Sequence, residues 1–398
     1  MKKLSLALAL ALMLSLAACG STPPAENLLS GRRPSGGELS GEAADAVVEF
    51  SLSLARQSGP GTLLSPLSAL FALGMTANGA EGETLAQMES VFGLDTGALN
   101  GALSALAASL GDEAQAANSL WIRDTDDFTV SEDFLSVCGE YYDAGVFTEP
   151  FDDSTLRAIN SWVSEQTGGL IGEILDEIPH DAVMYLVNAI GFSANWESIY
   201  REDQVRQGVF TTSGGEELQA DFMYGEESLY LEGEGFTGFM KPYEGGRYAF
   251  AALLPEEGSS PSELLEGLGG AELRELLASP QAASVSTSLP RFEGGSSLEL
   301  SDMLSAMGMT DIFDPERSEL CGLGSSAMGG LYVSRVLHET FIAVDERGTE
   351  AGAATAVEVM AEGAAEVMQS VYLDRPFVYL IVDTASGVPL FIGTLERP

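Results

Sequence analysis

The chain has 398 residues, with 18 lysine and arginine residues against 60 aspartate and glutamate residues, which gives a formal net charge of −42. A charge of this sign and size repels phosphate backbones, so it excludes most nucleic-acid binding. The same charge would steer basic partners towards the chain, and it would equally serve only to keep the chain soluble. Composition alone leaves both explanations open.

The first 18 residues have the parts of a secretory signal. Lys2 and Lys3 precede an apolar run at residues 4–14, and the segment ends in the lipobox Leu16-Ala17-Ala18-Cys19. This pattern predicts cleavage before Cys19 and lipidation of Cys19; cleavage after the small residues without lipidation is the alternative. The apolar run is too short to span a bilayer. We therefore predict an exported chain, outside the cytoplasm, that its lipid alone anchors to a bacterial cell envelope.

Residues 19–42 are small and polar, and they include Pro23-Pro24 and Gly36-Gly37. Such a segment cannot bury a core and is typical of a flexible tether. Without the two signal lysines the mature chain has 16 basic against 60 acidic residues, hence a net charge of −44. The predicted organisation is a signal peptide at residues 1–18, a lipidated tether at 19–42 and one folded domain at 43–398.

The first elements predicted along the folded domain are helices. Residues 43–57 place apolar side chains at helical spacing, which indicates an amphipathic helix. A second helix is expected to start at Ser65-Pro66, where serine can cap the first turn and proline suits the first helical position, and to end near Asn78-Gly79. A third covers residues 84–91.

Strand-like runs follow at residues 119–123, 183–187, 248–254, 283–292, 333–344 and 377–382. Further helices are predicted between them at residues 155–167 and 298–307. No composition break or internal repeat marks a second domain. The pattern therefore predicts a single α+β domain.

Cysteine and histidine are scarce. Besides Cys19 only Cys138 and Cys321 remain, and either two buried thiols or one long-range disulfide is compatible with an exported protein. His180 and His338 are the only histidines, and no cluster has the spacing of metal ligands. We predict no metal and no cofactor.

The segment between the last two strand-like runs, residues 344–371, is a long connection of small, acidic and apolar residues. Connections longer than about 12–15 residues are uncommon in compact domains and are usually functional or disordered. This one lacks the proline and serine clusters of a linker. Its composition favours an exposed protease bait loop that could itself become a strand.

The chain from about residue 43 to its end resembles the serpin family. The motifs that carry the resemblance are Leu64-Ser65-Pro66-Leu67-Ser68-Ala69, Ile159-Asn160-Ser161-Trp162-Val163, Leu186-Val187-Asn188-Ala189-Ile190-Gly191-Phe192 with Trp196, Arg375-Pro376-Phe377-Val378, and Val388-Pro389-Leu390-Phe391-Ile392-Gly393. The resemblance implies three β-sheets with about nine helices and an exposed reactive-centre loop at about residues 348–372. It also implies a monomer that inhibits serine endopeptidases as a suicide substrate, with the target protease held in a covalent acyl complex.

In this family the cleaved loop inserts into the main sheet, and the resemblance assigns two groups of residues to that step. The hinge comprises Glu346, Gly348, Thr349, Glu350, Ala351, Gly352, Ala353, Ala354 and Thr355. The shutter comprises Ser65, Pro66, Ser68, Asn188 and His338. An inserting strand needs small residues at alternating positions, and Thr349, Ala351 and Ala353 satisfy this.

The bait bond is less well defined. Counting the family's usual spacing from Glu346 places it at Glu362-Gly363, whereas counting back from Pro376 gives Ala365. The alternatives are Met360, Ala361, Ala364, Ala365 and Glu366. No lysine or arginine occurs between Arg347 and Arg375, so a trypsin-like protease is a poor target. Elastase-like or subtilisin-like proteases are favoured, and Glu362 would suit a glutamate-specific enzyme.

Other classes of function have less support. The chain has no GxSxG motif, and outside the signal its single lysine, Lys241, excludes an SxxK motif, so we predict no catalytic residues. A non-inhibitory serpin-fold lipoprotein that binds partners at the cell surface remains the alternative. Its support is Gly61, which stands where the family's shutter usually has asparagine, and Gly352 within the hinge.

Overall fold

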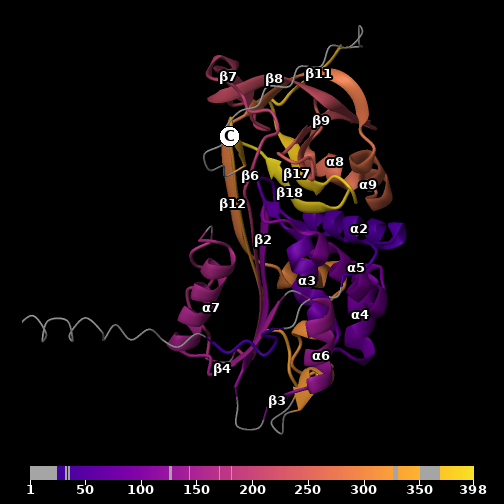
Figure 1. Ribbon diagram of the computed structural model, residues 1–398, viewed down its shortest axis with the longest axis vertical. Helices are drawn as coiled ribbons and strands as arrows, with labels where there is room; N and C mark the ends of the chain where they lie inside the picture. Colours follow the sequence, from indigo (N-terminus) through magenta and orange to yellow (C-terminus); the bar gives the residue numbers. More distant parts are fainter. Residues whose placement is uncertain are drawn as a thin grey trace, which may run out of the picture.

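The computed structural model describes residues 25–31, 34, 36–124, 128–142, 144–169, 171–180, 182–325, 330–349 and 368–398. Within these residues nine α-helices accompany a main sheet, a second sheet and a two-stranded ribbon (Figure 1). The α+β class predicted from the sequence is confirmed. No helix in the described part of the chain is long and apolar enough to cross a membrane.

The helices begin and end at residues suited to these positions. Ser40 caps the first by accepting a hydrogen bond from the Ala43 backbone N–H at 3.2 Å, and Gly93 ends the third with a φ of 70°. The helices are α2 (Gly41–Gln57), α3 (Pro66–Ala77), α4 (Gly82–Phe92), α5 (Thr96–Ser109), α6 (Glu132–Tyr141), α7 (Asp153–Gln166), α8 (Pro261–Gly267), α9 (Gly270–Ala278) and α10 (Ser301–Met307). Three short 3₁₀ helices are η1 (Glu202–Gln204), η2 (Asp311–Phe313) and η3 (Cys321–Leu323).

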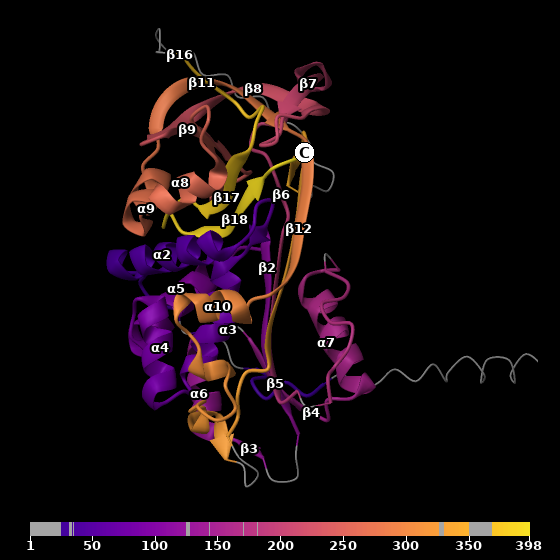
Figure 2. The same cartoon turned by 180° about the vertical axis from the view of Figure 1, so that it is seen from behind.

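The main sheet has helices on both faces. Its order is β4 (Gly145–Glu149), β2 (Ala114–Arg123), β5 (Met184–Phe192), β14 (Arg335–Val344), β15 (Gly348–Thr349) and β6 (Ala194–Asn195), with β12 (Phe292–Glu299) on β14. Tyr185 and Val187 of β5 pack towards α7, whereas Leu186 and Ile190 belong to the core that includes α3. All of β5, which lies between α7 and α3 in Figure 2, is therefore buried.

The second sheet lies in the upper part of Figure 1, and α2 lies between it and the helices α3 to α6. Its order is β1 (Leu63–Leu64), β18 (Pro389–Leu395), β17 (Phe377–Asp383), β10 (Tyr248–Pro255), β9 (Phe236–Pro242), β8 (Glu217–Gly233), β11 (Gln281–Pro290) and β16 (Met368–Tyr372), with β7 (Val205–Thr211) on β8. β3 (Thr129–Val130) and β13 (Gly324–Ser325) form the ribbon.

Several predicted boundaries are wrong for identifiable reasons. The run at 283–292 is two strands, because the chain leaves β11 at Pro290 and enters the main sheet as β12 at Phe292. The helix predicted from residue 298 starts at Ser301, since Leu298 pairs with His338 in β12. Ser65 makes no side-chain cap on α3, because its hydroxyl bonds elsewhere.

The packed part of the chain also starts earlier than predicted. Leu29, within the predicted tether, is buried, and the Leu28 N–H donates to the Val146 carbonyl of β4 at 2.9 Å. Cys138 is buried in α6, but Cys321 is exposed, so the expectation of two buried thiols is wrong for Cys321. No disulfide joins them in the described part of the chain.

Candidate functional site

The hinge begins inside the main sheet. After β14 ends at Val344, a turn held by the Asp345 carboxylate, which accepts from the Arg347 and Gly348 N–H groups at 2.7 and 3.1 Å, brings β15 back beside it. β15 pairs with β14 through Val344 and Thr349, and with β6 through Gly348 and Asn195. A Cβ on Gly348 would lie 2.1 Å from the Ala194 carbonyl oxygen, so this approach requires glycine.

An aromatic cluster fixes the inserted end of the hinge. Thr349 is fully buried, and its hydroxyl is hydrogen bonded to the Tyr243 hydroxyl at 2.6 Å. The Tyr243 ring stacks on Trp196 with centroids 4.5 Å apart and meets Phe192 edge-on at 4.9 Å. Burial raises the pKa of Tyr243 well above its ordinary value, so this hydroxyl stays protonated and can donate.

The same cluster holds the turn from outside the sheet. The Trp196 backbone and indole N–H groups donate to the carbonyls of Arg347 and Asp345, both at 2.8 Å. Arg291 and Glu346 form an ion pair at 2.6 Å. The hinge residues Glu346, Gly348 and Thr349 are therefore positioned by contacts with segments that are distant in sequence.

Away from the hinge, the main sheet has no gap between β5 and β14. β5 and β14 pair in parallel from Tyr185 and Arg335 to Ile190 and Thr340. Above Thr340 the chain that continues β5 becomes β6, and β15 lies between β6 and β14. The strands are thus separated only at the hinge end.

The residues predicted as the shutter meet where β5 and β14 are paired. The Ser65 N–H donates to His338 Nε2 at 3.0 Å, and its hydroxyl donates to the Leu390 carbonyl at 2.8 Å. Because Nε2 accepts, the His338 proton is on Nδ1, which donates to Asn188 Oδ1. Pro66 occupies the first turn of α3 and takes no part in these bonds.

Sequence reasoning missed one member of this shutter cluster. The Ser68 hydroxyl donates to Asn118 Oδ1 of β2 at 3.0 Å and lies 3.5 Å from Asn188 Oδ1. Asn118 shares the α3 side of its strand with Leu120 and Ile122, and a polar residue in such an apolar set is the signal that could have identified it. Gly61 lies outside the cluster, with a φ of 75° and its N–H bonded to Thr394.

Desolvation lowers the pKa of His338 to about 3. Geometry explains the direction, since a proton on Nε2 would face the Ser65 N–H, a second donor. His338 therefore stays neutral at physiological pH and ties β14 to the start of α3. Asn188 Nδ2 is buried without a hydrogen-bond partner in the described residues.

After the hinge, the next described segment of the chain is β16, which belongs to the second sheet. β16 pairs in parallel with β11 from Met368 and Ser284 to Tyr372 and Ser288. The span 350–367 thus connects the two sheets. All predicted bait residues, Met360, Ala361, Glu362, Gly363, Ala364, Ala365 and Glu366, lie outside the described residues, as do the hinge residues from Glu350 to Thr355 and Cys19.

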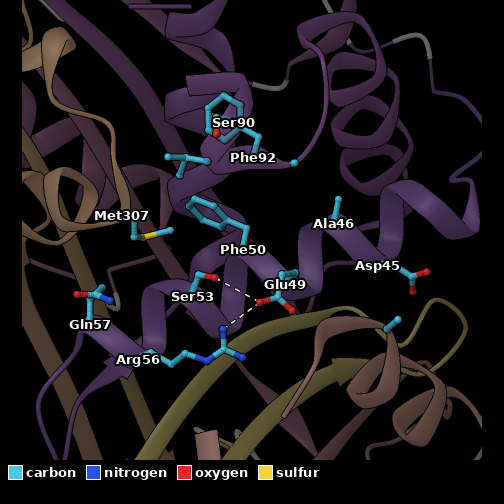
Figure 3. Close-up of a pocket in the computed structure, with 13 residues that line it drawn as sticks. Asp45, Ala46, Glu49, Phe50, Ser53, Arg56, Gln57, Ser90, Phe92 and Met307 are labelled. Carbon is cyan, nitrogen blue, oxygen red and sulfur yellow. Dashed lines mark hydrogen bonds and ion pairs between the residues drawn. The ribbon is translucent and has the colours of Figure 1, made fainter. Parts of the chain in front are cut away.

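The described surface also has grooves away from the hinge. A groove of about 610 Å³ along α2 is lined by Glu49, Phe50, Arg56 and Met307 (Figure 3). Arg56 in this groove is bonded to Glu49 at 2.9 Å and to two backbone carbonyls, so its charge is already neutralised. Among the described residues no group of three His, Cys, Asp or Glu side chains could hold a metal ion.

Comparison with known proteins defines the family. The family model described as "Serpin (serine protease inhibitor)" matches residues 45–398. Human neuroserpin is 31% identical over 359 residues, which cover 84% of this chain and 86% of that protein. A serpin-like protein of Thermococcus kodakarensis is 30% identical over 375 residues, covering 89% and 85% of the two chains. The chain therefore belongs to the serpin family, whose members are generally protease inhibitors rather than enzymes.

Two solved structures bear on the state of the sheet. The thermophilic serpin tengpin in its native state has a TM-score of 0.88 and 38% identity, covering 94% of this chain and 100% of that one. Its latent state has a TM-score of 0.79 and 37% identity, covering 91% and 99%. The arrangement described here is thus more similar to the native than to the latent form of that protein.

Proposed function

We propose that this chain inhibits serine endopeptidases as a suicide substrate, by inserting its cleaved loop between β5 and β14. The observation that carries the proposal is the position of Gly348 and Thr349, which lie between β14 and β6 while β5 and β14 remain paired below. A loop that starts inside the sheet can complete a strand by extending β15 along β14, provided that the pairing between β5 and β14 opens ahead of it.

The register of β15 supports this extension. Because Val344 pairs with Thr349 in an antiparallel ladder, continuation would place Ala351 opposite Ile342, and every second residue after it on the same face. That face of β14 is buried, with Ile342, Thr340, His338 and Val336 at 0 to 1% exposure. The incoming residues on this face, Ala351, Ala353, Thr355 and Val357, are small or β-branched and suit a buried strand.

Charged residues would take the other face. The same register places Glu350 opposite Ala343 and Glu358 opposite Arg335, where side chains point away from α3. Glu358 and Arg335 have opposite charges, so their pairing is favourable rather than repulsive. No buried charge opposes insertion of the first ten residues.

The chemistry follows from the order of events. The protease serine oxygen attacks the scissile carbonyl, the peptide C–N bond breaks, and the amine leaves with a proton from the catalytic histidine, so that an ester remains. Insertion of about 14 residues at about 3.3 Å each would carry the attached protease roughly 45 Å. Distortion that removes an oxyanion donor slows deacylation about 10²–10³-fold, which preserves the ester.

The target we propose is an elastase-like or subtilisin-like enzyme, with cleavage between Met360 and Glu366 and best at Glu362-Gly363. The absence of lysine and arginine between Arg347 and Arg375 supports this choice. We also propose export and lipid anchoring through Cys19 at a bacterial envelope. Replacement Cys19→Ser should release the chain from the membrane fraction and abolish incorporation of labelled palmitate.

The direct experiment mixes residues 20–398, which retain the packed Leu29 and the Ser40 cap, with pancreatic elastase, subtilisin, trypsin and a glutamyl endopeptidase, followed by denaturing gels and mass spectrometry. A denaturant-stable complex with a released C-terminal peptide is expected with elastase or subtilisin, and the peptide mass identifies the bait bond. Cleavage of the loop by elastase, subtilisin and the glutamyl endopeptidase without any complex would contradict inhibition and favour a non-inhibitory binding protein.

Substitution of Thr349 tests the insertion step. Thr349→Arg should convert the inhibitor into a substrate, because it places a charge at the buried position beside Tyr243 from which β15 has to extend. The matched control is Glu350→Arg, which adds the same side chain on the opposite face and should still inhibit. Stable complexes with Thr349→Arg at the yield of the unchanged chain would refute insertion.

A further inference from the structure

The outward face of β16 exposes large side chains next to the loop. β16 alternates, with Val371 buried against the core while Met368 and Tyr372 are 66% and 45% exposed. These two and Val209 are the large apolar residues that the described chain exposes. Two of the three therefore lie on one short strand, four positions apart on the same face.

The neighbouring strands extend this face. The sheet register places Tyr372, Ser288 and Tyr224 in one row across β16, β11 and β8, and Ser370, Ser286 and Glu226 in the next. Arg206 of β7 lies over the Tyr224 ring at 4.9 Å. We call this surface the β16 face; its members are Met368, Ser370, Tyr372, Ser286, Tyr224 and Glu226.

The composition is that of a recognition surface. Tyrosine and methionine offer large contact areas, and tyrosine loses little conformational entropy on binding because it has few rotatable bonds. The serines between them offer hydroxyl groups at low steric cost. The opposite face of the same strands packs Val285, Thr287 and Val371 into the interior, so the exposed Met368 and Tyr372 side chains are not needed for the core.

The position of the β16 face, directly after the loop, indicates which partner would bind to it. Met368 directly follows the span 350–367, and five residues separate it from Gly363, which is at most about 18 Å of extended chain. A protease domain of about 250 residues has a radius of gyration of about 18 Å. A protease engaged at the proposed bait bond would therefore be within reach of β16, which lies at the edge of the second sheet.

We propose that the β16 face is a second contact surface for the target serine protease, on the leaving-group side of the bait bond. This inference rests on the proposed inhibitory function and adds the surface that selects among proteases with similar clefts. Contacts here strengthen the encounter complex before acylation. Contacts on the β16 face do not contribute to loop insertion, because β16 belongs to the second sheet and the loop inserts into the main sheet.

The test separates encounter from insertion. Met368→Ser/Tyr372→Ser is compared with the unchanged chain and with Val209→Ser, which removes an exposed apolar residue from the other face of β7. Pancreatic elastase and subtilisin serve as probes, each active and with the catalytic serine replaced by alanine. The active enzymes give the half-saturation constant and the limiting rate of complex formation, and the inactive enzymes give Kd.

The double variant should raise Kd and the half-saturation constant about tenfold for at least one protease, as expected for the loss of binding hot spots. The limiting rate, the stoichiometry of inhibition and the Val209→Ser values should stay unchanged. Unchanged Kd values for both proteases would overturn the β16 face while leaving inhibition intact, and so would an effect confined to the limiting rate. Failure of the unchanged chain to form any covalent complex would instead contradict the proposed inhibition.

Discussion

At the scale of single residues, His338 makes the shutter cluster sensitive to acid. Its pKa is about 3 in the folded chain, against about 6.5 when unfolded. Between these values the unfolded chain binds a proton that the folded chain excludes, so stability falls as pH falls from 6.5 to 3, by about 1.4 kcal/mol per pH unit. His338→Asn should remove this contribution.

The measurement is the urea concentration at the unfolding midpoint of both chains. Unfolding is monitored by tryptophan fluorescence at pH values from 7.5 to 4.5. The difference between the two chains isolates His338, because the carboxylates that also titrate in this range are common to both. Parallel pH dependences would show that His338 is not held neutral by its contacts with Ser65 and Asn188.

Lys241 and Glu227 form a buried ion pair under the hinge. Their charged atoms lie 2.8 Å apart, the side chains are only 4% and 8% exposed, and the ammonium lies over the Tyr200 ring at 4.3 Å. Lys241→Ala should destabilise the chain by about 3–5 kcal/mol, because Glu227 would remain buried without its partner. The volume-matched double replacement Lys241→Met/Glu227→Leu should restore most of that loss. A double variant as unstable as Lys241→Ala in urea unfolding would show that packing, rather than an unpaired charge, is the cause.

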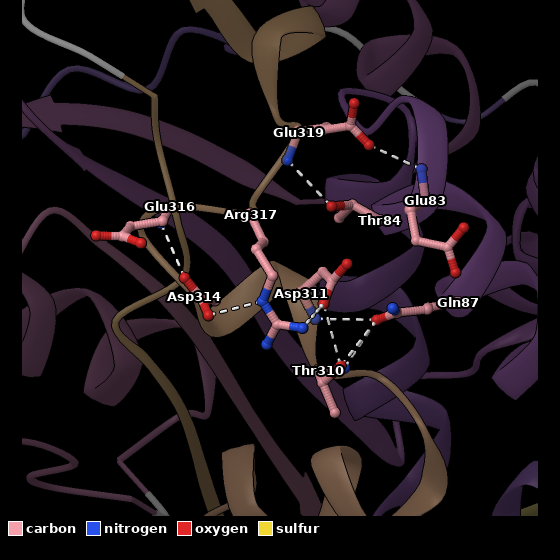
Figure 4. Close-up of polar contacts among 9 residues, drawn as sticks. All are labelled: Glu83, Thr84, Gln87, Thr310, Asp311, Asp314, Glu316, Arg317 and Glu319. Carbon is pink, nitrogen blue, oxygen red and sulfur yellow. Dashed lines mark hydrogen bonds and ion pairs between the residues drawn. The ribbon is translucent and has the colours of Figure 1, made fainter.

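At the scale of elements, segment 310–319 is fixed to α4 by a polar network (Figure 4). Gln87 Oε1 accepts from the backbone N–H groups of Thr310 and Asp311 at 3.0 and 2.9 Å. Gln87→Ala should cost about 1–3 kcal/mol, because it leaves partly buried N–H groups without an acceptor. The comparison is Glu319→Ala, which removes an acceptor for the exposed Glu83 N–H at 2.7 Å and should cost about 1 kcal/mol or less, because water can replace that bond. Equal losses in thermal unfolding would contradict this ranking.

Local patterns predicted the elements better than their ends. Helical spacing identified α2 and α4, but nothing local marks Arg291 as the residue where the chain passes between sheets. Ser65 illustrates a different limit, since a serine before a proline is typical of a cap, yet its hydroxyl bonds to Leu390, 325 residues away in sequence. Tertiary contacts decide such cases.

The sequence likewise predicted some residues of the candidate site and missed others. Ser65, Ser68, Asn188 and His338 were grouped through the family resemblance, and the structure brings them together. Tyr243, which holds Thr349, carried no sequence signal, because the contact joins residues 106 positions apart. The register that would align Ala351 and Ala353 with the buried face of β14 follows from the pairing of Val344 with Thr349, which no local pattern predicts.

At the scale of the whole molecule, the native sheet is expected to hold less than its maximum stability. β5 and β14 pair over only part of their length, and β15 occupies only the hinge end of the space between β14 and the chain that follows β5. Cleavage within residues 350–367 would free the rest of the loop to extend β15, and each added residue would bond to both neighbours. The gain in hydrogen bonds and burial should exceed the entropy lost on ordering.

Thermolysin offers a way to measure this gain, because a metalloprotease uses zinc-activated water and forms no acyl-enzyme that could be trapped. The cleaved chain should unfold at a higher temperature than the intact chain, and for a domain of this size a gain of about 5 kcal/mol corresponds to a rise of roughly 7 °C. Cleaved Thr349→Arg should show little rise, because its loop cannot enter the buried face. If the cleaved unchanged chain also keeps the midpoint of the intact chain, the loop does not insert, and the partial entry of Thr349 is an end point rather than a first step.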